Sequence, residues 1–181
     1  MPLTREEAET WVANVQASVA QTFKKWGGMN PVAFIITELD PRTGEKADTP
    51  NLCVIPFEGE FDEKNRKAFA SLLHEMADSL QANGVAFASE AWMANVQGAT
   101  LAESEENTKK WAGNLAEHPE KVEVVVLIVE HRLLGNRSYI GRVLRGEKTA
   151  TITSWVEQNE KFGPPEGSFT HFLKEEPHGD A

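Results

Sequence analysis

Cysteine and long apolar runs are both scarce in this sequence. Cys53 is the only cysteine in 181 residues, which excludes an intrachain disulfide and any zinc site built from several cysteines. The longest apolar run, residues 124–129, is far shorter than the roughly 20 residues that a membrane-spanning helix needs. The polar and acidic first residues show no secretory signal. We therefore expect a protein of the reducing cytoplasm with no membrane partner.

Positive charge is also in short supply. The chain has 18 Lys and Arg residues against 28 Asp and Glu residues, which gives a net charge of -10 at pH 7. A surface of this sign repels nucleic-acid phosphates and anionic membranes, so we expect neither as a partner. The acidic residues are dispersed along the chain, which argues against an acidic mimic of nucleic acid. A protein partner remains compatible with the charge.

The standard catalytic motifs are missing as well. The sequence contains no glycine-rich phosphate loop, no His-Glu-x-x-His helix and no nucleophile elbow. Glu130 and His131 look like a pair of metal ligands, but neighbouring residues on a strand point to opposite faces and cannot readily share one ion. We therefore expect no metal and no cofactor.

What the sequence does contain is the pattern of one α+β domain. Apolar residues at helical spacing predict two helices, one from the capping box at Thr4 to Gly27 and one from Asp62 to Asn83. Short β-rich segments predict about six strands: residues 31–37, 52–57, 84–93, 122–130, 137–144 and 148–156. The expected order is α-β-β-α-β-β-β-β, with helices packed against a largely antiparallel or mixed sheet.

The predicted domain covers residues 1–157. Its first two strands are expected to pair as a hairpin with a long connection, and residues 95–119 form a polar excursion in which residues 102–115 could be helical. Residues 158–181 are rich in glycine and proline, which predicts an irregular, partly disordered tail. Three phenylalanines of this tail are candidates for docking it on the body: Phe162, Phe169 and Phe172.

Glu90 is the chemically unusual residue of the predicted central strand, residues 84–93. On a strand it shares a face with Ala88 and Trp92, and we expect the whole stretch to be buried on both faces. A buried carboxylate needs a raised pKa or a paired cation, which Arg142 or Arg137 could supply. A structural ion pair, or a place near the exposed end of the strand, explains Glu90 without any catalytic role. The alternative is a catalytic acid or base.

A second group of polar residues, Glu117-His118-Pro119-Glu120, precedes the strand at residues 122–130. It reads either as a turn or as a set of acids and ligands. Together with Ser89-Glu90-Ala91-Trp92, this segment resembles a group of uncharacterised small bacterial proteins that carry a "SEAW" strand and a histidine-proline-acid-base lead-in to the next strand. The resemblance covers about residues 30–145. That group has no assigned activity, so the resemblance implies no cofactor or substrate, but it raises the chance that Glu90 and His118 matter together.

These observations favour a non-enzymatic, macromolecule-binding domain that forms a homo-oligomer. An open sheet leaves edges to be paired, and residues 95–119 and 157–181 are candidate binding segments. The alternative is a metal-dependent or acid–base enzyme of the hydrolase kind, with Glu90 and His118 as catalytic residues and Trp92 and Arg142 as binding residues. A small-molecule binding module is a third possibility that the sequence does not separate from these two.

Overall fold

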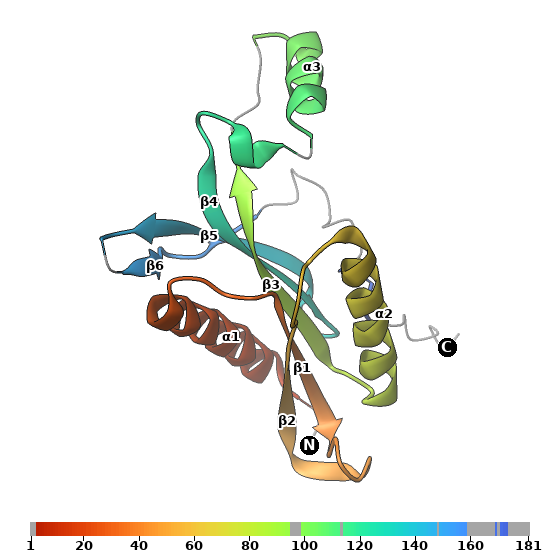
Figure 1. The fold of residues 1–181 in the computed structure, drawn as a ribbon. Helices are drawn as coiled ribbons and strands as arrows, with labels where there is room; N and C mark the ends of the chain where they lie inside the picture. Colours follow the sequence, from red (N-terminus) through yellow and green to blue (C-terminus); the bar gives the residue numbers. More distant parts are fainter. Residues whose placement is uncertain are drawn as a thin grey trace.

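The chain folds into a curled antiparallel sheet with one long helix on each face (Figure 1). This computed structural model describes residues 3–94, 99–112, 114–147, 149–158, 169 and 171–173. Helix α1 (Arg5–Trp26) covers one face of the sheet, and helix α2 (Glu63–Ser79) covers the other. The α+β class predicted from the sequence is confirmed.

The strands of the sheet lie in the order β2-β1-β3-β4-β5-β6, and β7 also pairs with β5. Every pairing between the described strands is antiparallel. The strand bounds are β1 Val32–Leu39, β2 Lys46–Pro56, β3 Gly84–Met93, β4 Val122–His131, β5 Gly135–Arg145, β6 Ala150–Ile152 and β7 Val156–Glu157. The last predicted strand, residues 148–156, is therefore two short strands in the structure.

Both long helices begin where their sequences predict, and α1 also ends there, whereas α2 ends at Ser79 and not at the predicted Asn83. The Thr4 hydroxyl accepts a hydrogen bond from the Glu7 amide, and the Glu7 carboxylate accepts one from the Thr4 amide, so the capping box is formed. Gly27 ends α1 with φ 73°, a left-handed conformation that suits glycine. The Asp62 side chain caps α2 by accepting from the Asn65 amide.

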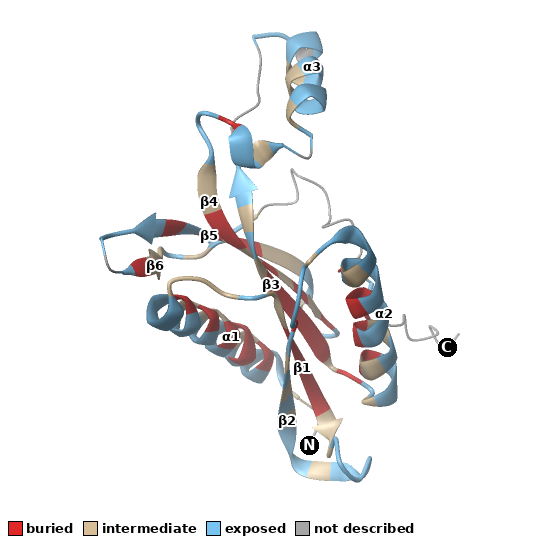
Figure 2. Cartoon of the chain, viewed as in Figure 1, coloured by how far each residue is buried: buried red, intermediate tan, exposed pale blue. Residues whose placement is uncertain are grey.

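Buried residues lie along the central strands and on both long helices (Figure 2). Strand alternation divides them into two cores, one on each face of the sheet. Phe34 and Leu127 point toward α1 and pack with its apolar stripe, which includes Val15, Val19 and Phe23. Phe87 and the other alternate residues point toward α2. The central strands are therefore covered on both faces, as their apolar composition predicts.

Part of the C-terminal segment completes the core on the α2 side. Phe169 and Phe172 are buried there, and the Phe169 ring stacks on Phe87 with the ring centroids 3.9 Å apart. The Glu130 carboxylate accepts hydrogen bonds from the Phe172 and Leu173 amides at 2.8 and 2.9 Å. The predicted docking is thus confirmed for Phe169 and Phe172, whereas Phe162 lies outside the described residues.

One connection differs from the expected one, and the other contains the helix that the sequence allowed within residues 102–115. The hairpin of β1 and β2 is formed, but β2 begins at Lys46, so its connection is residues 40–45 and not a long loop. Between β3 and β4 stand helix α3 (Leu101–Trp111) and a short 3-10 helix, η1 (Leu115–Glu117), at the outer end of these strands (Figure 1). None of the described side chains of α3 is buried.

Candidate functional site

Glu90 lies on the predicted face of β3 but is exposed, so its expected burial is wrong. The reason is the length of the pairing between β1 and β3. Strand β1 pairs with β3 only from Gly84 to Ala88, where Ala88 faces Val32. Beyond Ala88 the strand continues with β4 alone on one side, and its residues become progressively exposed. Glu90 therefore stands where the strand leaves the core.

The Glu90 carboxylate holds the connection between α1 and β1. Its Oε1 atom accepts a hydrogen bond from the Met29 amide at 2.5 Å. A Cβ atom added to Gly28 would lie 3.0 Å from the same oxygen, so the backbone passes close to the carboxylate. The hydrogen bond joins the segment after α1 to the part of β3 that no longer pairs with β1.

Arg142, the expected partner of Glu90, lies on the opposite face of the sheet. Arg142 is opposite Val124, which is opposite Ala91, whereas Glu90 is in register with Val125 and Gly141. Neighbouring positions on a strand point to opposite faces, so the Arg142 side chain is directed toward the α2 side. The prediction that Arg142 neutralises Glu90 is therefore wrong.

The other candidate cation, Arg137, is engaged elsewhere. Its guanidinium binds Glu9 of α1 at 3.0 Å and lies 3.6 Å from Glu157. A further cation on the Glu90 side of the sheet is Arg145, which forms an ion pair with Glu123 and donates to the Gly27 carbonyl at 2.7 Å. The hydrogen bond to Glu123 is the main cause that raises the pKa of Arg145, and the charge of Glu90 adds to it.

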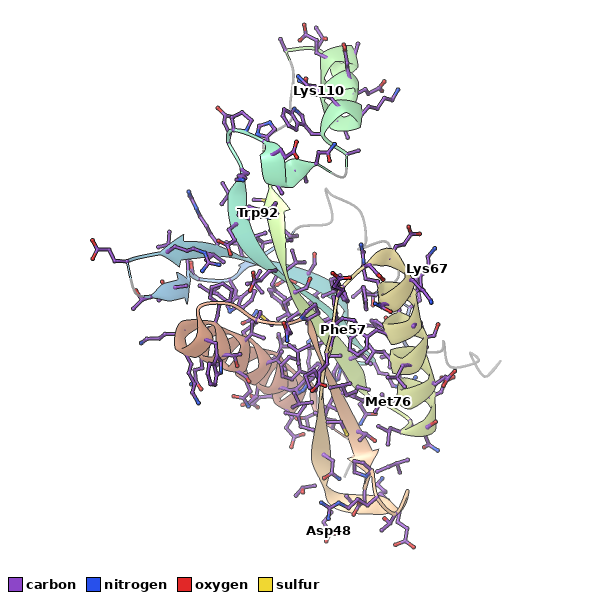
Figure 3. All side chains as sticks on the ribbon, viewed as in Figure 1. Asp48, Phe57, Lys67, Met76, Trp92 and Lys110 are labelled. Carbon is purple, nitrogen blue, oxygen red and sulfur yellow. The ribbon has the colours of Figure 1, made fainter. Side chains whose placement is uncertain are left out.

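His118 and Trp92 lie at the outer end of β3 and β4, away from the Glu90 contacts. The buried His118 ring packs edge-on against Trp111 at 4.6 Å, and its Nδ1 atom accepts from the Glu120 amide at 3.1 Å. His118 and Glu90 have separate hydrogen-bond partners among the described residues, and the surroundings of His118 fit the turn interpretation. A core position for Trp92 is wrong, because its side chain is 40% exposed and the Lys121 ammonium lies 4.9 Å from the ring centroid (Figure 3).

Glu90 instead opens onto a pocket on the α1 face of the sheet. The pocket has a volume of about 670 Å³ and lies between α1 and a floor made by β1 and β2. Its walls are mainly apolar, and Trp26 at the end of α1 is 72% exposed at its edge. Its main apolar lining residues are Val19, Trp26, Met29, Phe34, Val54 and Pro56. Glu90 is the charged residue among those that line it.

The pocket exists because α1 covers only part of its face of the sheet. The helix lies against β4 and β6. Strand β2, at the other edge, is left uncovered on this side, so Leu52 and Val54 are 51% and 54% exposed. On the opposite face of the same strand, Cys53 and Ile55 pack against the α2 core. Strand β2 therefore has one packed face and one bare apolar face.

The described residues contain no group of three or more His, Cys, Asp or Glu side chains placed to hold a metal ion. No described helix has the length and apolar content needed to cross a membrane. Glu130 and His131 point to opposite faces, as expected, since Glu130 binds the Phe172 and Leu173 amides while the His131 ring packs on Trp11 at 5.6 Å. Comparison with known protein families, curated proteins and solved structures finds no match.

Sequence reasoning missed the pocket residues and Arg145. One signal was present: Ser18, Thr22 and Trp26 recur every four residues beside the buried stripe of α1 and so share a helix face. That face of α1 borders the pocket, and the spacing of residues along a helix does not show which side of it lies beside a pocket. Arg145 was missed because its pairing with Glu123 depends on the register of β4 and β5.

Replacing Glu90 with alanine is expected to cost little stability, about 1 kcal/mol or less. The side chain is exposed and water can replace it at the Met29 amide, in contrast to the several kcal/mol expected for a buried ion pair. Urea unfolding of Glu90→Ala beside Glu90→Gln, which keeps an acceptor, measures the difference. A loss of 3 kcal/mol or more would show that the carboxylate is a major structural element.

Proposed function

We propose that this chain is a non-enzymatic binding domain that associates with a second copy of itself through strand β2. The observation that carries the proposal is the open outer edge of β2, which stands at one end of the sheet with Leu52 and Val54 bare on one face. Sheet edges with exposed apolar residues are templates for pairing with another strand.

The charge pattern of β2 supports this choice of edge. Natural edge strands are commonly guarded by charged residues or prolines. Charges occur near the hairpin end of β2, at Lys46 and Asp48, but residues 49–56 carry none. Pro50 and Pro56 bound the segment 51–55, so an unguarded stretch of five residues is left for pairing. The other edge strand, β6, is only three residues long.

A second copy is the simplest occupant of this edge. Two β2 strands paired antiparallel about a two-fold axis perpendicular to the sheet satisfy both edges at once, and the interface is the same patch on both copies. That symmetry keeps the same face of both sheets on the same side. Leu52 and Val54 of each copy then lie beside those of the other, as cross-strand apolar neighbours.

The hydrolase alternative has less support. It needs Glu90 and His118 in one site, and among the described residues these two side chains have separate partners. The excursion between β3 and β4 remains a candidate for binding a further partner, because the described side chains of α3 are not buried and Trp92 is exposed beside it.

Light scattering after size-exclusion chromatography tests the self-association. We expect a mass of about 40 kDa, twice the 20.1 kDa of one chain, at concentrations of tens of micromolar. Leu52→Lys is expected to give a monomer, because a charge on the bare face of β2 opposes edge pairing. The matched control is Val156→Lys, which places the same charge on an exposed valine of β7 and should leave the dimer intact. A monomer of the unsubstituted protein throughout that range would refute the proposal.

A further inference from the structure

We infer that the pocket between α1 and the floor of β1 and β2 binds a small hydrophobic cation, that is, an ammonium group carried on an apolar chain or ring. This inference concerns a ligand site and does not depend on self-association through β2. It rests on the size of the pocket, on its lining and on the place of Glu90 within it.

The size and lining of the pocket fit a small organic molecule. Small-molecule sites commonly have volumes of roughly 300–1,000 Å³ and are mostly apolar, with a few polar groups that set the orientation of the ligand. The pocket measures about 670 Å³, and Phe34, Val54 and Pro56 make an apolar floor. The polar atoms at its border come from Ser18, Thr22, Asn30 and Glu90. An apolar chain or ring would cover Val54 and Pro56, which are exposed to solvent.

The negative charge of Glu90 favours a positively charged ligand. Glu90 is the sole charged residue among the described residues that line it. One carboxylate oxygen of Glu90 accepts from the Met29 amide, and among the described residues the other oxygen has no hydrogen-bond partner. An ammonium group that donates to that oxygen forms a charge-assisted hydrogen bond, whereas a carboxylate or phosphate ligand is repelled.

The neighbouring ion pair does not occupy the Glu90 carboxylate. The Arg145 guanidinium binds both oxygens of Glu123 and donates to the Gly27 carbonyl. The charge of Glu90 acts on Arg145 without an ion pair, and among the described residues no cation forms an ion pair with Glu90. The carboxylate is therefore available to a bound ammonium group.

The backbone at Gly28 and Met29 holds the Glu90 carboxylate in one position. The Met29 hydrogen bond fixes one oxygen, and the close approach of Gly28 restricts the carboxylate from that side. A carboxylate held in place loses little freedom when a ligand binds, which favours affinity and a defined orientation. The apolar part of the ligand then extends from Glu90 along the floor toward Val54 and Trp26.

Calorimetric titration with octylammonium, octanoate and octanol, at a fixed ionic strength of about 0.1 M, tests the inference. The three probes share one chain and differ in the charge of the head group. Octylammonium is expected to bind at least about tenfold more tightly than octanoate, with octanol between them. The Met29 amide resonance should shift on titration with octylammonium, because the carboxylate that accepts its hydrogen bond gains a second donor.

Glu90→Gln should weaken octylammonium about tenfold and leave octanol unchanged. The matched control is Glu75→Gln, which removes an exposed acid from α2 on the other face and should change neither probe. Thr22→Trp, at an exposed position of the pocket lining, should weaken all three probes.

Three results would overturn the inference. These are equal binding of octylammonium and octanoate, equal effects of the Glu90 and Glu75 substitutions, and no binding of any probe. The second would mean that the overall net charge of -10 attracts the cation without a site. Leu52→Lys, which lies outside the pocket lining, separates this test from that of self-association, because octylammonium should bind this variant as it binds the unsubstituted protein.

Discussion

Phe169→Ala is expected to lower the free energy of unfolding by about 3 kcal/mol, although it lies in the segment that the sequence marks as an irregular tail. Its side chain is buried, and its ring lies flat on Phe87 with an angle of 3° between the ring planes. Phe61 and Phe69 complete the surrounding aromatic group. Removing the ring leaves a cavity in the core on the α2 side. The domain can close this cavity only if α2 moves. Urea unfolding followed by circular dichroism measures the loss.

Leu133→Ala is the control for this substitution, because Leu133 is an exposed apolar residue in the turn between β4 and β5 and should cost about 0.5 kcal/mol or less. Phe172→Ala should resemble Phe169→Ala, since Phe172 is buried in the same core and its amide is bound by Glu130. Losses below about 1 kcal/mol for both phenylalanines would mean that this segment does not contribute to the folded domain.

Local patterns in the sequence were sufficient for the fold class and for most elements. The capping box at Thr4, the helix end at Gly27 and the division of residues 85–88 between the two faces of the sheet each depend on neighbours within a few residues, and each is found as predicted. The third helix, Leu101–Trp111, falls in the stretch that was expected to be an excursion with possible helical parts. Its sequence is mostly polar and has no row of apolar residues at helical spacing, so the first and last residues of the helix could not be predicted.

The site was predicted less well because it depends on long-range pairing. Local alternation predicts which face of the sheet Glu90 occupies. Its exposure depends on where the pairing of β1 with β3 ends, which is at Val32 and Ala88. In the same way, Arg142 and Arg145 look alike in sequence, and the register of β4 with β5 decides which face each occupies. The bare face of β2 depends on where α1 lies across the sheet, which no local pattern encodes.

His131 is a buried titratable residue whose environment favours the neutral ring. Its side chain is 2% exposed and packs against Trp11. Its Nδ1 atom accepts a hydrogen bond from the Leu133 amide at 3.0 Å, so this nitrogen carries no proton. The Nε2 atom is buried with no hydrogen-bond partner among the described residues. Burial is the main cause that lowers the pKa of His131 to about 4, and the charge of Arg137 lowers it further, against the opposing effect of Glu9.

This environment makes stability depend on pH between about 6.5 and 4. In that window the unfolded chain binds a proton at position 131 and the folded chain does not, so the unfolded state gains stability as the pH falls. The free energy of unfolding should be steady above about pH 6.5, decrease by about 3 kcal/mol between pH 6.5 and 4, and receive no further contribution from this group below that. Urea titrations at half-unit pH steps and constant ionic strength give the curve.

His131→Asn separates this effect from that of the carboxylates. The Asn Oδ1 atom can accept from the Leu133 amide as Nδ1 does, but asparagine does not titrate, so the slope between pH 6.5 and about 4.5 should disappear even if the smaller side chain lowers stability at every pH. Glu7 and Glu38, whose pKa values are lowered mainly by hydrogen bonds to Thr4 and Lys46 respectively, lose their contributions only below about pH 4.5. Their effect therefore remains in both proteins at the acid end. An unchanged slope in His131→Asn would mean that the ring is protonated in the fold and that the Leu133 hydrogen bond is not formed as the structure has it.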